Sequence, residues 1–161
     1  MRTIWGIDPA SKKIAMFTGS KSGLDLIQAE LAEVPRSNRN DELMALRSKL
    51  EFVIGPDGDH VIFCEEPVVA GARNLRSTIL VAETVGMILA LNARVHLVPV
   101  SSWKKGTVGK GNATKDEVSE WLRREHPQYA GYCRDTKWRE SQDLRDAAAI
   151  YLYGRSLDIG S

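Results

Sequence analysis

The sequence predicts a mixed α/β protein in which a five-stranded sheet is flanked by helices, with elements in the order βββαβαβαα. Two observations favour this class. Short β-prone apolar runs alternate with longer segments whose apolar residues recur at helical spacing, and three of the strand-like runs precede the first helical segment. The chain has 161 residues, 43% hydrophobic and 27% charged. These values are typical of one globular domain, so we expect residues 1–161 to form a single domain.

The first three strands are predicted from β-prone runs bounded by turn residues. Residues 3–7 form the first run, and we interpret Asp8-Pro9 as the turn that ends it. Residues 13–18 and 24–31 are the second and third runs, separated by a segment rich in glycine and serine. Connections this short predict an antiparallel meander.

The middle of the chain reads as helix, strand, helix, strand. Leucines at helical spacing follow Asn40 and Asp41, either of which can cap a helix that ends before residue 56. The continuous apolar run 61–64 predicts a buried central strand. A long helix over 75–91 and a strand over 95–98 follow.

The last third of the chain is predicted to contain two helices. Thr114 and Glu117 have the spacing of a capping box at the start of the first. Residues 127–141 are polar, and we expect them to be irregular. The final helix is expected over residues 142–153, with Ser141 as its cap.

Charge is distributed unevenly, although the net charge is only +1. Residues 25–66 contain four Lys or Arg against ten acids, whereas residues 67–115 contain seven against one acid. Such blocks are expected where a basic surface surrounds an acidic centre, and chance segregation of solvated charges would also produce them.

Several classes of protein are disfavoured. No apolar run has the length of a membrane span, so we expect no membrane role. Cys64 and Cys133 form no CxxC pair and follow no signal peptide, which favours a reduced, cytoplasmic setting. The three histidines lack the spacing of a zinc site, and the glycine-rich segment 106–112 matches neither phosphate-loop pattern.

Five carboxylates are candidates for chemistry. Asp8 follows the first strand, Glu65 and Glu66 follow the fourth, and Asp143 and Asp146 share one face of the final helix. They converge if these strands are neighbours and the helix crosses their ends. Oxygen ligands without His or Cys favour Mg²⁺ or Mn²⁺, and two such ions support phosphodiester hydrolysis. Taken singly, Asp8 could instead form a turn, and Asp143 could complement a helix dipole.

Four segments in this order resemble the RuvC-type Holliday junction resolvases of the ribonuclease H-like superfamily, over nearly the whole chain. They are residues 4–11 (IWGIDPAS), the strand ending in Glu65-Glu66, residues 104–115 (KKGTVGKGNATK) and residues 143–150 (DLRDAAAI). The resemblance implies a ribonuclease H-like sheet and an endonuclease that cleaves branched DNA. It also implies two Mg²⁺ ions per active site, with Mn²⁺ able to substitute, held by Asp8, one of Glu65 and Glu66, Asp143 and Asp146. Because strand residues alternate in direction, only one of the two glutamates can face the metals.

The resemblance further implies that Lys104 and Lys115 contact DNA phosphates. Four more basic residues extend the same block and are candidates for DNA binding, namely Lys105, Lys110, Arg73 and Arg76. Symmetric cleavage of a four-way junction needs two active sites, so a homodimer is expected, with the apolar helix over 75–91 as its interface or as a core helix.

The sequence departs from the resolvase pattern at two places. Ala10 replaces a glycine after the first strand, and Val68 or Val69 stands where the family often has an aromatic residue. We therefore expect cleavage with a relaxed sequence preference. The expected substrates are four-way junctions, with forks and flaps as further candidates. The alternatives are a YqgF-like RNA-processing nuclease of the same fold and a module that binds junctions without cleaving them.

Overall fold

The computed structural model describes residues 2–19, 27–69 and 74–157, and its centre is one five-stranded sheet. The strand order is β3-β2-β1-β4-β5, with β1 antiparallel to β2 and parallel to β4. The first and fourth strands are therefore neighbours, which is the arrangement that convergence of the carboxylates requires. The strands are β1 (Arg2–Pro9), β2 (Lys13–Thr18), β3 (Gln28–Glu33), β4 (Asp59–Glu65) and β5 (Arg94–Val98).

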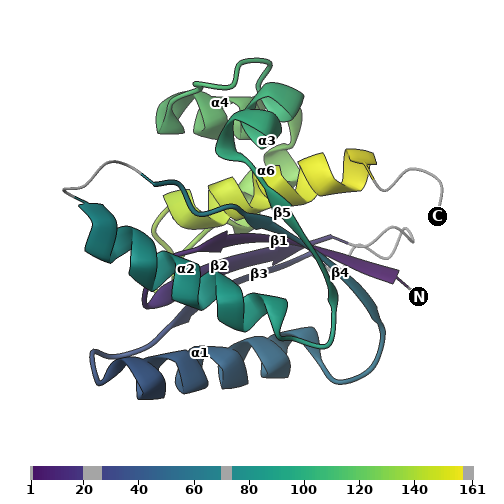
Figure 1. The fold of residues 1–161 in the computed structure, drawn as a ribbon. Helices are drawn as coiled ribbons and strands as arrows, with labels where there is room; N and C mark the ends of the chain where they lie inside the picture. The colour runs from purple at the N-terminus through teal and green to yellow at the C-terminus, as the bar shows by residue number, and fades with distance from the viewer. Residues whose placement is uncertain (1, 20–26, 70–73, 158–161) are drawn as a thin grey trace.

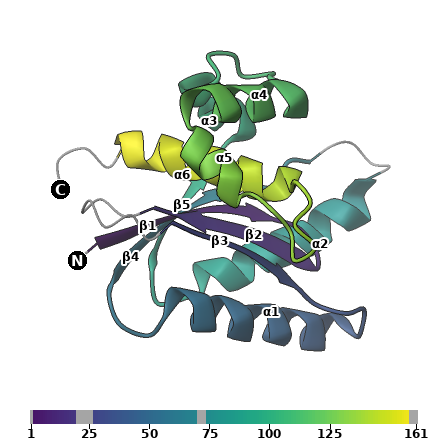
Figure 2. The ribbon, with the colours of Figure 1, turned by 180° about the vertical axis from the view of Figure 1, so that it is seen from behind.

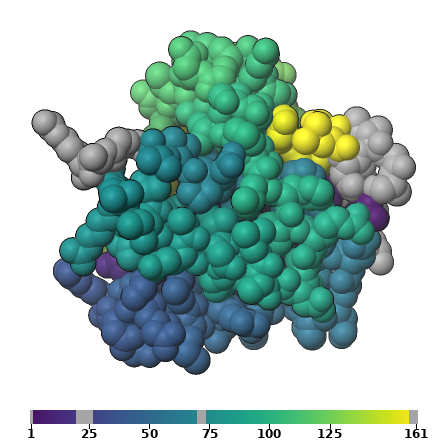
Figure 3. Space-filling model, in the orientation of Figure 1, coloured from purple at the N-terminus to yellow at the C-terminus, as the bar shows by residue number. Residues whose placement is uncertain are grey.

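Helices cover both faces of the sheet (Figures 1 and 2). Helices α1 and α2 lie on one face, and α6 crosses the other face with α3, α4 and α5 packed around it. Figure 3 shows α3 and α4 as a lobe that projects beyond the body of the molecule. The helices are α1 (Arg39–Ile54), α2 (Leu75–Leu89), α3 (Val100–Thr107), α4 (Lys115–Glu125), α5 (Pro127–Tyr132) and α6 (Gln142–Leu157).

Strand alternation divides the core into two layers. On β1, Ile4 belongs to the cluster beneath α6, whereas Trp5 and Ile7 belong to the cluster beneath α1 and α2. On β4, Phe63 faces α6 and Ile62 faces the opposite side. Both central strands are thus buried on both faces, which is why their sequences are almost continuously apolar.

Gly6 allows α6 to lie unusually close to β1. A Cβ atom at this position would be 2.2 Å from the backbone oxygen of Ala147 and 2.3 Å from the backbone nitrogen of Tyr151. Any side chain at Gly6 would therefore push α6 off the sheet. This close contact holds the first turns of α6 over the end of β1.

The predicted end of the first strand and the predicted cap of the first helix were wrong. Strand β1 does not end before Asp8-Pro9, because Asp8 pairs with Ala15 and Pro9 pairs with Ile14 on β2. The first helix is capped by Asn38, whose side chain accepts a hydrogen bond from the Asp41 backbone nitrogen. Asp41 thus lies in the first helical turn, where its charge complements the helix dipole.

Two short helices were not predicted. The first, α3, occupies part of the basic block, and α5 replaces the start of the segment expected to be irregular. Pro127 begins α5 and Tyr129 is buried from it, so a proline start and one apolar anchor stabilise this short helix. The third strand begins at Gln28, and residues 24–26 of the predicted run lie outside the described residues.

The two helix caps predicted in the last third of the chain were confirmed. Thr114 and Glu117 form both hydrogen bonds of the capping box, and the Ser141 hydroxyl accepts a hydrogen bond from the Leu144 backbone nitrogen at the start of α6. Cys64 and Cys133 are free and buried. No helix within the described residues is long and apolar enough to cross a membrane.

Candidate active site

Two carboxylates enter the site from neighbouring parallel strands. Asp8 lies two residues beyond Gly6 on β1, so its side chain points to the same face of the sheet, toward α6. Glu65 lies two residues beyond Phe63 on β4 and also points to that face. Because β1 and β4 run parallel, the two acids meet at one end of the sheet.

Glu66 is placed elsewhere. It follows β4 by one residue, so alternation turns its side chain away from α6, and this side chain is exposed. Its backbone nitrogen donates a hydrogen bond to the Val98 carbonyl, which continues the pairing of β4 with β5. Of the two glutamates left open by the sequence, the structure brings only Glu65 into the group with Asp8.

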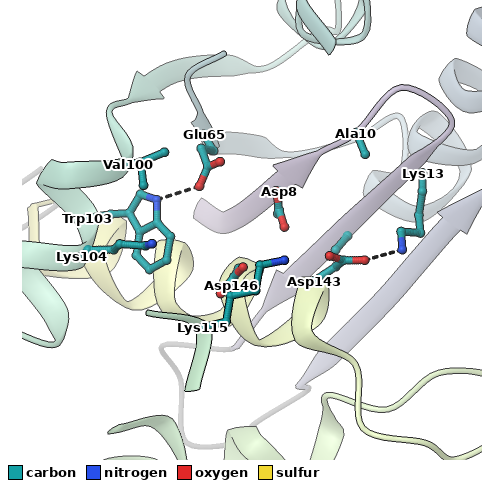
Figure 4. A pocket seen from close by; sticks show the side chains of 11 residues that line it. Asp8, Ala10, Lys13, Glu65, Val100, Trp103, Lys104, Lys115, Asp143 and Asp146 are labelled. Carbon is teal, nitrogen blue, oxygen red and sulfur yellow. Dashed lines mark hydrogen bonds and ion pairs between the residues drawn. The ribbon is translucent and has the colours of Figure 1, made fainter. Parts of the chain in front are cut away.

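The first turns of α6 bring two more carboxylates to the same place. Asp143 and Asp146 line a cavity of about 240 Å³ together with Asp8 and Glu65. Figure 4 shows the four side chains directed into a common space between β1, β4 and α6. Four acids from three separate segments of the chain are thus gathered in one cavity.

Burial and nearby negative charge disfavour the charged forms of three of these acids, Asp8, Glu65 and Asp146. The pKa of Asp8 is raised well above its usual value, first because the carboxyl is buried and then because Glu65, Asp146 and Asp143 are near. Burial is also the main reason that the pKa values of Glu65 and Asp146 are raised. Lys115 acts in the opposite direction on all three groups. The cavity is therefore suited to receiving positive charge.

Three of the acids are held by neighbouring side chains. The indole nitrogen of Trp103 on α3 donates a 2.9 Å hydrogen bond to Glu65 Oε2, and Gln142 Nε2 donates a 3.1 Å hydrogen bond to Asp146 Oδ1. Lys13 on β2 forms an ion pair with Asp143. Sequence reasoning missed Trp103, because no helix was predicted there and an isolated tryptophan gives no signal of a polar contact.

The donor set fits a hard divalent cation. All four acids offer carboxylate oxygens, and Cys64 is buried on the opposite face of the sheet. Within the described residues, no three Asp, Glu, His or Cys side chains are already arranged as a metal-binding group.

The predicted DNA-binding residues separate into two groups. Lys104 and Lys115 line the carboxylate cavity, and Lys104 Nζ donates a 2.7 Å hydrogen bond to the Ala113 carbonyl. Lys110 lies outside the cavity and forms an ion pair with Glu117. Lys105 and Arg76 are exposed and do not line the cavity, and Arg73 lies outside the described residues.

Comparisons with known proteins agree on the fold. Three solved structures are similar over 93–97% of this chain, each with 15% sequence identity. Thermus thermophilus RuvC in complex with a Holliday junction gives a TM-score of 0.65, with 91% of that chain covered. Yeast mitochondrial Holliday junction resolvase Ydc2 gives 0.64 with 76% covered, and fowlpox virus resolvase bound to Holliday junction DNA gives 0.59 with 99% covered. No protein family model and no curated protein sequence matches the chain.

These similarities establish the class of fold. The chain has the ribonuclease H-like fold, in the form found in Holliday junction resolvases of bacteria, a yeast mitochondrion and a poxvirus. The predicted fold class is thereby confirmed. At 15% identity, the likeness shows the fold alone.

Proposed function

We propose that this protein is a divalent-metal-dependent endonuclease that cleaves branched DNA, with four-way junctions as its principal substrate and relaxed sequence preference. The observation that carries the proposal is the single cavity in which four carboxylates face two lysines. Binding DNA alone gains nothing from uncompensated carboxylates beside phosphates, so this cavity favours catalysis over a non-cleaving module. The junction-bound structures of similar fold support the choice of substrate.

We assign metal binding to Asp8, Glu65, Asp143 and Asp146. Two Mg²⁺ or Mn²⁺ ions, when bound, activate a water molecule and stabilise the leaving oxygen in phosphodiester hydrolysis. The work of the chain is to hold the four carboxylates on rigid elements and to keep them ready for cations. Trp103 holds Glu65 in the cavity, and Gln142 does the same for Asp146.

Lys104 and Lys115 are proposed to hold the phosphates beside the scissile bond. Lys104 lies on α3 and Lys115 begins α4, and both line the cavity, so each can neutralise a phosphate there without a change in the backbone. Lys110 has Glu117 as a partner, and Lys105 and Arg76 are exposed away from the cavity. These outer residues are proposed to contribute only to longer-range attraction of DNA.

We propose a homodimer for the active enzyme. Leu75, Ile79 and Leu89 on α2 are all about half exposed, which leaves an apolar stripe on the outer face of this helix. The prediction of a core helix is also partly right, since Val85 and Ile88 are buried against the sheet. Two copies joined through the stripe would supply the two active sites that a four-way junction requires.

A cleavage assay tests the proposal. Wild-type protein is incubated with four-way junctions, forks, flaps, duplex DNA, single strands and structured RNA, each with Mg²⁺, Mn²⁺ or EDTA. We expect metal-dependent cleavage of the junction, abolished in Asp146→Asn and retained in the matched variant Glu66→Gln. Preferential cleavage of the RNA would favour an RNA-processing nuclease. Cleavage by Asp146→Asn at the wild-type rate would reject the mechanism.

A further inference from the structure

An exposed aromatic pair lies near the candidate active site, outside the residues discussed so far. Trp138 is 79% exposed and Tyr132 is 52% exposed, and the two line a common cavity of about 500 Å³ formed by the end of α5 and the segment that follows it. Neither ring stacks on another aromatic ring among the described residues. Figure 2 shows the segment that joins α5 to α6. Residues of this segment line the cavity together with the end of α5.

Trp138 is held in an unusual backbone conformation. Its φ angle of +61° is the only positive value of a non-glycine residue in the described part of the chain. A bulky side chain in this region is strained, so surrounding contacts must maintain it. Asp135 provides them: its carbonyl accepts a hydrogen bond from the Trp138 nitrogen, and its carboxylate accepts hydrogen bonds from the backbone nitrogens of Lys137 and Arg139. The segment 134–140 is thus a closed hairpin that presents the tryptophan to solvent.

The hairpin also carries positive charge that protein carboxylates do not neutralise. Asp135 is paired with Arg139, and Glu140 is paired with Arg145. Arg134 donates a hydrogen bond to the Trp138 carbonyl, and neither Arg134 nor Lys137 has a carboxylate partner among the described residues. An aromatic ring beside cations that have no carboxylate partner among the described residues matches the base and phosphate of a nucleotide.

The aromatic pair is connected to the carboxylate cavity. A third cavity, of about 750 Å³, shares Lys13 and Asp143 with the carboxylate cavity. It shares Asp135 and Thr136 with the cavity beneath Trp138. The third cavity therefore adjoins both the carboxylate cavity at the start of α6 and the cavity beneath Trp138 on the hairpin.

We propose that the 134–140 hairpin is a base-stacking site, where Trp138 and Tyr132 stack on an unpaired nucleobase. The base belongs to the same branched DNA molecule whose scissile phosphate lies at the carboxylate cavity. The proposal rests on the nuclease function proposed above. Because the hairpin is closed by its own hydrogen bonds, little order is lost when a base stacks on it. Unpaired or distorted bases occur at a branch point, so this site would select branched over regular duplex DNA.

Equilibrium binding tests the proposal with a fluorescein-labelled four-way junction in EDTA, where no cleavage occurs. Trp138→Ala is expected to weaken binding roughly 5- to 140-fold, because base–aromatic stacking contributes ~1–3 kcal/mol per base and 1.4 kcal/mol is tenfold. Trp138→Tyr should bind within about threefold of wild type, since a phenol ring also stacks on a base. The matched control is Phe52→Ala, which removes an 89% exposed ring from α1, on the other face of the sheet.

The remaining variant separates stacking from folding. Trp138→Gly removes the ring and also the strain at positive φ, so it should fold at least as stably as wild type and still lose affinity for the junction. Wild-type affinity in Trp138→Ala, or an equal loss in Trp138→Tyr, overturns the stacking site while cleavage by wild-type protein leaves the nuclease function standing. Failure of wild-type protein both to bind branched DNA and to cleave it with Mg²⁺ or Mn²⁺ rejects both proposals.

Discussion

The hydrogen bond from Trp103 to Glu65 allows a sharp test of how the active site is held. Trp103 is 1% exposed and its indole nitrogen lies 2.9 Å from Glu65 Oε2. Trp103→Phe keeps an aromatic ring in the same pocket and removes the donor. A hydrogen bond to a charged group contributes ~1.5–3 kcal/mol, and partial exposure of Glu65 places this one near the lower end. The smaller ring adds roughly 1 kcal/mol for lost buried volume.

The expected loss for Trp103→Phe is therefore about 2–3 kcal/mol in the free energy of unfolding, or roughly 5–10 °C in Tm for a chain of this size. Cleavage should suffer separately. A carboxylate that loses its orienting partner costs ~10–100-fold in metal affinity or activity, so the Mg²⁺ concentration for half-maximal cleavage should rise.

The assay is a titration of junction cleavage with Mg²⁺, combined with thermal unfolding in EDTA. Trp121→Phe is the matched control, because Trp121 is a partly buried tryptophan on α4 that packs edge-on against His126 and does not contact Glu65. Trp103→Phe with the Mg²⁺ dependence of wild type would refute the orienting role. An equal change in Trp121→Phe would attribute the effect to general packing.

Three further outcomes are expected. Gly6→Ala should destabilise the protein by roughly 1–3 kcal/mol in a denaturant titration and slow cleavage in a gel assay, because a Cβ atom there meets the α6 backbone. Gly131→Ala is the control: a Cβ atom there has open space, so neither stability nor cleavage should fall. Metal-free wild type should lose stability as pH rises from about 4 through the raised folded pKa of Asp8. In thermal unfolding with EDTA, Asp8→Asn should make this decline smaller without abolishing it, because the pKa values of Glu65 and Asp146 are raised as well; parallel curves for the variant and wild type would contradict the contribution of Asp8. Lys115→Ala should weaken junction binding and reduce its salt dependence more than Lys110→Ala does, because Lys115 lines the cavity whereas Lys110 is paired with Glu117 in the wild type. Equal effects of the two substitutions would contradict a phosphate contact by Lys115.

Much of the fold could be read from the sequence, because its main elements carry strong local signals. The apolar run of β4 and the capping box of α4 depend on neighbouring residues alone, and both were predicted correctly. The helix α3 was missed because only Trp103 is buried from it, so its eight residues carry no helical pattern of apolar positions. The cap of α1 was misplaced by two or three residues because several residues before it can serve as caps.

The candidate site shows what the sequence determines and what tertiary structure decides. The order of strands and the spacing of Asp143 and Asp146 were enough to predict that these acids approach Asp8. The choice between Glu65 and Glu66 needed the structure, because β4 is buried on both faces and its apolar residues do not reveal which face receives α6. Pairing with β1 and the close approach of α6 at Gly6 decide that Glu65 enters the cavity. Residue types and local spacing are written in the sequence, whereas the face on which a strand residue acts depends on contacts between segments far apart in the chain.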